Sequence, residues 1–119
     1  MRFIPASVHG FLDYAVGLTL IIAPFALGFK GMEIVLSVAG GAGLIVYSLI
    51  TDYSVSARRL LPFSVHLAID FIAALVLIAA PFIFNFGGVA QAFYVVMGVS
   101  VIGAVLLTNP NVEDAPHPA

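Results

Sequence analysis

Four long apolar runs constrain the fold of this chain more than any other feature. They cover residues 8–29, 34–50, 65–86 and 89–107. Each run is close to the roughly 20 residues that an α-helix needs to cross the ~30 Å hydrocarbon core of a bilayer. Backbone polar groups in lipid must be satisfied internally, and these runs do not alternate as barrel strands do. We therefore expect four transmembrane helices.

The composition supports lipid as the surrounding solvent. Of the 119 residues, 62% are hydrophobic and only 8% are charged, whereas about a quarter of the residues of a soluble domain are charged. The net charge of −2 argues against a nucleic-acid partner, which requires a basic surface. The absence of cysteine excludes disulfides and thiolate metal sites, so histidines are the available nitrogen ligands.

The chain also contains an internal repeat with an offset of 57 residues. Without any gap, 12 of the 25 positions from residue 5 to residue 29 are identical to their partners in the second half. The repeated residues include proline, histidine and aspartate, which an apolar bias alone does not produce. The sequence therefore predicts two copies of one helical hairpin. The identical pairs are Pro5/Pro62, Ser7/Ser64, Val8/Val65, His9/His66, Asp13/Asp70, Leu18/Leu75, Leu20/Leu77, Ile21/Ile78, Ala23/Ala80, Pro24/Pro81, Phe25/Phe82 and Phe29/Phe86.

Two spans in each copy mean that both copies enter the membrane from the same side. The expected fold is an all-α integral membrane four-helix bundle of two tandem parallel hairpin repeats, related by a pseudo-two-fold axis. We assign the first repeat to residues 1–57, the second to 58–109 and a polar mobile tail to 110–119. Arg2, Arg58 and Arg59 place both termini in the cytoplasm by the positive-inside rule, as expected for a bacterial inner-membrane protein.

A duplicated His-x-x-x-Asp pattern is the main candidate for a site. One helical turn separates His9 from Asp13 and His66 from Asp70, so the members of each pair share a helix face. If the first helix begins near Pro5, Asp13 lies about 10 Å along it. An ionisable group at that depth is expected to face the bundle interior and to have a partner. The pseudo-two-fold axis would then bring the two pairs together at the cytoplasmic end.

Polar residues at the ends of the second and fourth spans are expected at the same end of the bundle. Tyr47 and Ser48 belong to this group, and the supporting polar residues of the predicted site are Thr51, Asp52, Thr108 and Asn109.

Several roles are open for this polar group. In a structural role, the histidines and aspartates hydrogen-bond one another or the nearby threonines and hold helix ends together. As a metal site, His9, His66, Asp13 and Asp70 offer ligands that suit zinc, iron or manganese. A haem held by the two histidines is a third role. Proton or ion conduction ranks last, because the far half of every span is apolar.

Small residues are expected to bring the helices of each hairpin close together. The second span contains the run Ala39-Gly40-Gly41-Ala42-Gly43, and the fourth contains Gly98 and Gly103. Spacings of this kind are typical of close helix–helix contacts in membranes. We interpret these glycines as packing residues.

The end of each first span carries a second repeated motif. It reads Ala23-Pro24-Phe25-x-x-Gly28-Phe29 in the first copy and Ala80-Pro81-Phe82-x-x-Asn85-Phe86 in the second. Together with the preceding His-x-x-x-Asp, this motif resembles the SPW-repeat family of small membrane proteins over about residues 2–109. Serine is replaced by alanine, and tryptophan by phenylalanine, in both copies. The resemblance implies a four-span membrane protein and no established activity.

No enzymatic template is present, since the sequence lacks a nucleophile elbow, a phosphate loop and a dinucleotide fingerprint. The leading interpretation is a non-enzymatic membrane protein that packs against itself or larger membrane proteins in the bilayer. Metal or haem binding by the duplicated His-x-x-x-Asp residues is the alternative, and ion conduction is the third hypothesis.

Overall fold

A computed structural model of the chain describes residues 2–51 and 56–111. Four α-helices form in the predicted places. They are α1 (Ala6–Ala26), α2 (Met32–Leu49), α3 (Phe63–Ile83) and α4 (Gly88–Leu107). All four are long and apolar enough to cross a membrane. The prediction of four spans is confirmed.

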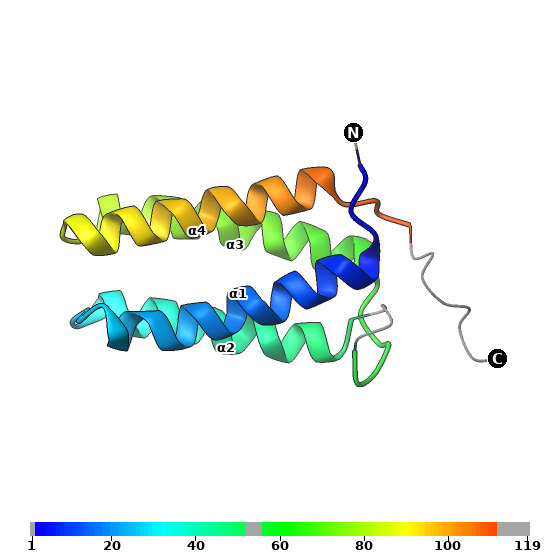
Figure 1. Cartoon of the computed structure of the whole chain (residues 1–119), viewed down its shortest axis with the longest axis horizontal. Coiled ribbons are helices and arrows are strands. Elements are labelled where there is room, and N and C mark those ends of the chain that lie inside the picture. Colours follow the sequence, from blue (N-terminus) through cyan, green and yellow to red (C-terminus); the bar gives the residue numbers. More distant parts are fainter. Residues whose placement is uncertain (1, 52–55, 112–119) are drawn as a thin grey trace.

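The helices form two antiparallel hairpins that lie side by side (Figure 1). α1 packs along α2, and α3 packs along α4, whereas contacts between the hairpins are fewer. Both hairpins turn at the same end of the bundle, and the chain enters both from the opposite end (Figure 1). The protein is therefore an all-α four-helix bundle of two parallel hairpin repeats, as predicted.

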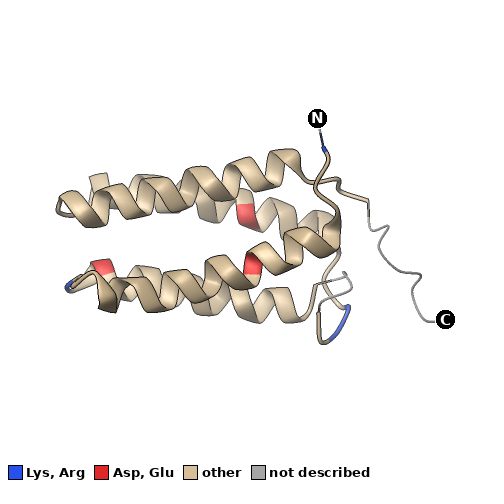
Figure 2. Cartoon of the chain, in the orientation of Figure 1, with Lys and Arg blue, Asp and Glu red and all other residues tan. Residues whose placement is uncertain are grey.

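Charged residues are scarce along the helices. Asp13 lies within α1 and Asp70 within α3. Figure 2 shows red segments within the bundle, and the blue segments lie close to its ends. Large apolar side chains such as Phe11, Ile72 and Val96 are about 60% exposed. Such a surface is suited to lipid rather than to water.

A repeated proline motif ends the first helix of each hairpin. The amide of Phe29 donates to the carbonyl of Pro24, and the amide of Phe86 donates to that of Pro81, both at 2.9 Å. The residue just before each phenylalanine has a left-handed backbone, with φ of 73° at Gly28 and 56° at Asn85. Glycine and asparagine are the residues that adopt this conformation most readily at the end of a helix. The motif therefore forms the outer turns.

The proline and the phenylalanine that follows it in each motif have different surroundings. Pro24 and Pro81 are buried between the helices. Phe25 and Phe82, in contrast, are 63% and 59% exposed and face the surroundings of the bundle. The proline thus shapes the helix end, while the aromatic side chain is available to lipid.

Proline removes a hydrogen-bond donor from the helix, and the structure supplies a substitute in the first hairpin. Pro24 has no N–H to offer the carbonyl of Leu20, four residues earlier. The hydroxyl of Ser37 in α2 donates to that carbonyl at 2.5 Å. The carbonyl that lacks its helical donor thus has a partner from the neighbouring helix, and the bond also joins α2 to α1.

Glycine brings the helices together at one level of each hairpin. A Cβ atom at Gly41 would lie 2.5 Å from the carbonyl oxygen of Gly17, and one at Gly98 would lie 2.8 Å from that of Ala74. These positions confirm the close packing predicted from the sequence. A Cβ atom at Gly40, Gly43 or Gly103 would meet no atom within 4 Å. The prediction of close helix contacts within the chain is therefore wrong for these three glycines.

Short backbone pairings link the two hairpins at the end of the bundle where the chain enters both of them (Figure 1). Ile4, just before α1, pairs with Thr108 at the end of α4. Leu61, just before α3, pairs in the same way with Thr51 at the end of α2. The repeat offset relates Ile4 to Leu61 and Thr51 to Thr108, so the two links are equivalent. Each pairing places a threonine of one hairpin next to the start of the first helix of the other hairpin.

Candidate functional site

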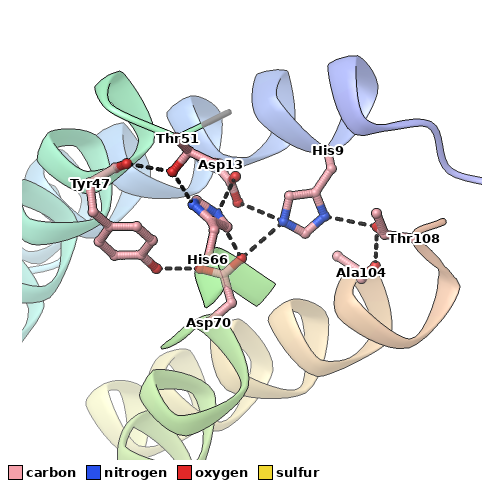
Figure 3. Close-up of polar contacts among 8 residues, drawn as sticks. All are labelled: His9, Asp13, Tyr47, Thr51, His66, Asp70, Ala104 and Thr108. Carbon is pink, nitrogen blue, oxygen red and sulfur yellow. Dashed lines mark hydrogen bonds and ion pairs between the residues drawn. The ribbon is translucent and has the colours of Figure 1, made fainter. Parts of the chain in front are cut away.

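The four residues of the duplicated His-x-x-x-Asp pattern meet inside the bundle. His9 and Asp13 come from α1, and His66 and Asp70 come from α3 (Figure 3). All four are buried, with exposed fractions of 6% or less. We refer to these four residues as the His/Asp cluster. Asp13 and Asp70 each lie seven residues into their helices, which places the cluster about 10 Å from the helix starts.

Each histidine contacts both aspartates through its Nε2 atom. Between hairpins, His9 Nε2 lies 2.9 Å from Asp70 and His66 Nε2 lies 2.8 Å from Asp13. Within each helix the corresponding distances are 3.2 Å for His9 to Asp13 and 3.1 Å for His66 to Asp70. The contacts therefore follow the pseudo-two-fold relation of the repeats, and the contacts between hairpins are the shorter ones.

A threonine from the opposite hairpin holds the other nitrogen of each histidine. His9 Nδ1 lies 2.8 Å from the hydroxyl of Thr108, and His66 Nδ1 lies 2.7 Å from that of Thr51. Both hydroxyls donate their hydrogen to a backbone carbonyl one turn earlier, at Ala104 and Tyr47.

These hydroxyl bonds determine the proton positions on the imidazoles. A threonine hydroxyl has one hydrogen, so a hydroxyl that donates to a carbonyl accepts from the histidine. Nδ1 of each ring therefore carries a hydrogen. Nε2 of each ring is the nitrogen directed at the carboxylates, either as an N–H donor in a charged imidazolium or as a bare lone pair in a neutral ring.

Tyr47 breaks the symmetry of the cluster. Its hydroxyl donates to Oδ1 of Asp70, while Oδ2 of the same carboxylate contacts the histidines (Figure 3). The repeat offset places Ala104 at the equivalent position, which has no hydroxyl to offer Asp13. The tyrosine bond to Asp70 therefore has no counterpart from the equivalent position of α4.

Sequence reasoning named Tyr47 among the polar residues of this end but did not include it in the site. The available signal was its spacing of four residues before Thr51, which predicts that both lie on the same side of the chain at the end of the second span. Of the predicted supporting residues, Thr51 and Thr108 lie in the site. Asn109 uses its backbone N–H to bond Ile4 and its side-chain oxygen to accept from Asn111. Asp52 lies outside the described residues.

The helix-end residues do not belong to this site. Pro24 and Pro81 lie near the opposite ends of α1 and α3 from the His/Asp cluster, at the outer turns. Phe25 and Phe82 are exposed there. The two repeated motifs of the sequence therefore have separate places in the fold, one shaping the turns and one forming the polar centre.

The donor set of the His/Asp cluster fits a single metal ion. One ligand atom from each of the four residues can be chosen so that all four lie within 4.8 Å of one another. Metal bonds of 2.0–2.2 Å in a tetrahedral site separate the ligand atoms by about 3.3–3.6 Å. The histidine–carboxylate distances of 2.8–3.2 Å are only slightly shorter. A small outward shift of the side chains would accommodate an ion.

Comparison with known proteins agrees with the motifs and the fold. A family model described as the SPW repeat domain matches residues 7–108. The chain belongs to the SPW repeat family. No curated protein and no solved structure matches it. With its four apolar helices, this SPW-repeat protein is a small integral membrane protein.

The matched region of the SPW-repeat protein contains the whole site. It begins two residues before His9 and ends at Thr108, so all four members of the His/Asp cluster and both threonines fall within it. The family assignment supports the architecture and carries no activity with it.

Proposed function

We propose that this protein binds one divalent transition-metal ion at the His/Asp cluster, within the membrane. The observation that carries the proposal is that each of the two histidines and two aspartates offers one ligand atom, and these four atoms lie within 4.8 Å of one another. Two imidazole nitrogens and two carboxylate oxygens suit zinc, iron or manganese. This proposal takes up the alternative hypothesis of the sequence analysis rather than its leading interpretation, a protein that acts by packing in the bilayer.

The threonines support metal binding by orienting the rings. A metal-bound histidine usually donates its other N–H to an oxygen acceptor, which sets the tautomer and the direction of the ring. Thr108 is such an acceptor for His9, and Thr51 is one for His66. In this arrangement Nε2 of each histidine offers a lone pair to the ion, and the charges of the two carboxylates balance that of a divalent cation.

A bound ion would join the two hairpins. Each hairpin contributes one histidine and one aspartate, and contacts between the hairpins are otherwise few. A ligand that binds only the folded state stabilises that state in proportion to its concentration relative to its dissociation constant. We therefore expect the ion to stabilise the paired hairpins and to make the thermal stability depend on the metal.

A metal-free clamp is the second candidate. Two imidazolium groups and two carboxylates would form a neutral cluster, and four ion pairs of 2.8–3.2 Å favour it. Removing one member of a buried ion pair leaves an unpaired charge and costs about 3–5 kcal/mol. This candidate predicts a stable protein that requires no metal.

Haem binding and ion conduction are less well supported. A haem between His9 and His66 would need the space next to their Nε2 atoms, where carboxylate oxygens lie within 3.2 Å. Conduction requires polar groups along the whole span. A cavity between α2 and α3, which extends from Asp70 to Ala80, has mainly apolar walls.

Elemental analysis of the purified protein tests metal binding. The protein in detergent is incubated with zinc, manganese or iron(II), washed, and analysed for metal per chain. We expect one ion per chain in the wild type and none in a His9→Ala/His66→Ala double variant. The control is His117→Ala, which removes the third histidine of the chain. His117 is not a member of the His/Asp cluster, so this variant should bind the metal like the wild type.

A second variant separates the loss of metal ligands from a loss of folding. Asp13→Asn/Asp70→Asn keeps the side-chain size and hydrogen-bonding atoms but removes both negative charges from the ligands. We expect it to retain helical circular dichroism and to lose the metal. A wild type that binds no stoichiometric metal, together with a double histidine variant that only loses stability, would overturn the proposal in favour of the clamp.

We further propose the setting in which this site works. The basic residues Arg2, Arg58 and Arg59 favour both termini and the His/Asp cluster on the cytoplasmic side of a bacterial inner membrane. We propose residues 1–57 and 58–109 as the two repeats, with 110–119 as a tail of which residues 112–119 lie outside the described chain. Association with a second copy or with larger membrane proteins remains a prediction, as does the absence of enzymatic activity.

A further inference from the structure

The two aspartates of the His/Asp cluster present their oxygens to the histidines in different ways. Asp13 places Oδ1 3.2 Å from His9 Nε2 and Oδ2 2.8 Å from His66 Nε2. Asp70 places a single oxygen, Oδ2, near both histidines, at 2.9 Å and 3.1 Å. Its other oxygen, Oδ1, accepts the hydrogen bond from the hydroxyl of Tyr47 (Figure 3). Three carboxylate oxygens thus lie against the histidines, and the tyrosine holds the fourth.

Tyr47 is held beside Asp70 by contacts with the rest of the cluster. Its ring lies against the imidazole of His66, with the ring centroids 4.7 Å apart. Its backbone carbonyl accepts the hydrogen bond of the Thr51 hydroxyl, which in turn accepts from His66 Nδ1. Tyr47 is therefore joined to both cluster residues of α3, and these contacts keep its hydroxyl at Oδ1 of Asp70.

The number of ligand atoms distinguishes the metals that the four residues suit. Two imidazole nitrogens and four carboxylate oxygens would make six ligands, the number in the octahedral sites that manganese prefers. With Oδ1 of Asp70 bonded to Tyr47, the four residues offer at most five ligand atoms. Zinc is held by four ligands in most protein sites and accepts a fifth. The cluster as it is folded therefore fits zinc better than manganese.

The surroundings of the cluster disfavour water as a sixth ligand. All four cluster residues are buried, and the ring of Phe63 lies 5.6 Å from that of His9 and 6.0 Å from that of His66. The cavity beside Asp70 has mainly apolar walls. An apolar shell of this kind limits the access of solvent to a metal site. The oxygen nearest to hand for a sixth position is thus Oδ1 of Asp70.

We propose that Tyr47 is a positioning residue that makes this site selective for zinc over manganese(II), by keeping one oxygen of Asp70 away from the ion. The proposal rests on metal binding at the His/Asp cluster, the function proposed above. Tyr47 acts through Asp70 and does not bind the ion itself. The second repeat carries Ala104 at the equivalent position, so this selectivity is a property of the first hairpin and not of the repeat in general.

Competition of the full chain in detergent with a chromophoric chelator, for zinc and for manganese(II), tests the selectivity. Tyr47→Phe keeps the ring and removes the hydroxyl, so Oδ1 of Asp70 becomes able to turn toward the ion. Zinc binds more tightly than manganese to most sites, so the role of Tyr47 is measured by the change in the ratio of the two affinities. We expect the zinc-to-manganese ratio to fall about tenfold, the lower end of the range for removing a partner of a metal ligand.

A control variant and a second measurement separate positioning from stability. Tyr94→Phe is the matched control, because Tyr94 is a buried tyrosine whose hydroxyl donates to the carbonyl of Glu33, outside the cluster. It should leave the zinc-to-manganese ratio unchanged. X-ray absorption spectroscopy of the zinc-loaded wild type requires no variant to fold, and it should count four or five nitrogen and oxygen ligands.

The results that would contradict the proposal can be told apart. If the wild type binds zinc and Tyr47→Phe leaves the ratio unchanged, for example by weakening both metals equally, the selectivity role is overturned and the metal site stands. Six ligands around zinc in the wild type would have the same consequence, because both oxygens of Asp70 would then bind. A wild type that binds neither metal would overturn the metal site itself and the selectivity with it.

Discussion

The hydrogen bond from Ser37 to Leu20 makes a specific prediction about the proline in α1. Ser37→Ala removes the hydroxyl that serves the Leu20 carbonyl, and Pro24 cannot replace it because it has no N–H. Pro24→Ala would restore an N–H one turn after Leu20. We therefore expect Ser37→Ala to be destabilising in the wild type and close to neutral when Pro24 is alanine.

The magnitude follows from burial and geometry. Ser37 is completely buried, and its hydroxyl lies 2.5 Å from the Leu20 oxygen. A buried carbonyl left without a donor costs about 1–3 kcal/mol, while side-chain hydrogen bonds measured in membrane proteins average about 0.6 and reach about 1.7 kcal/mol. We expect Ser37→Ala to lower the free energy of unfolding by about 1–2 kcal/mol, and the coupling with Pro24→Ala to be of the same size.

The assay is reversible unfolding in mixed micelles of mild and denaturing detergent, followed by circular dichroism for the four members of the double-mutant cycle. Ser100→Ala is the matched control, because Ser100 is exposed and donates to the Val96 carbonyl of its own helix. It should change the unfolding free energy by less than about 0.5 kcal/mol. Equal costs of Ser37→Ala with and without Pro24 would refute the reasoning.

Three other predictions use the same preparations. Gly41→Ala places a Cβ atom 2.5 Å from the Gly17 oxygen and should cost about 1–3 kcal/mol of unfolding free energy, whereas Gly40→Ala meets no atom and should be neutral or slightly stabilising. Equal effects of the two would contradict the described helix contact. Thr108→Val removes the acceptor of His9 Nδ1 and should weaken metal binding by about 10- to 100-fold in competition with a chromophoric chelator. The exposed Thr19→Val is its control, and an unchanged affinity in Thr108→Val would count against the ring-orienting role. Tyr47→Phe removes a bond to a charged acceptor and should lower the unfolding free energy by about 1.5–3 kcal/mol, so that a loss below about 0.5 kcal/mol would argue against this bond.

Much of the fold was predictable because its physical causes are local in the sequence. Apolar runs of the length of a bilayer predict transmembrane helices irrespective of their partners. The offset of 57 residues relates the two hairpins and requires them to be parallel. The motif around Pro24 and Pro81 ends the helices because proline and a left-handed residue act on their own backbone. The one-turn spacing of His9 and Asp13 places both on one face.

The tertiary structure alone decided what these residues contact. Spacing within a helix predicts the pair His9–Asp13, yet the shorter contact of His9 is with Asp70 of the other hairpin. The threonine that holds His9 is separated from it by 99 residues. Such contacts depend on how the two hairpins pack and on the segments that link them, and no local pattern records either.

The same limit applies to the glycines and to Tyr47. Gly40 and Gly41 are neighbours with the same local preferences, but one lines a cavity and the other meets the backbone of α1. Which of them is in contact depends on the rotation of α2 against its neighbours. The sequence by itself thus determined the four spans, their pairing into repeated hairpins and the residues able to form a site. The packing of the hairpins decided which of these residues meet, because a buried polar contact requires a partner from another helix at a defined distance.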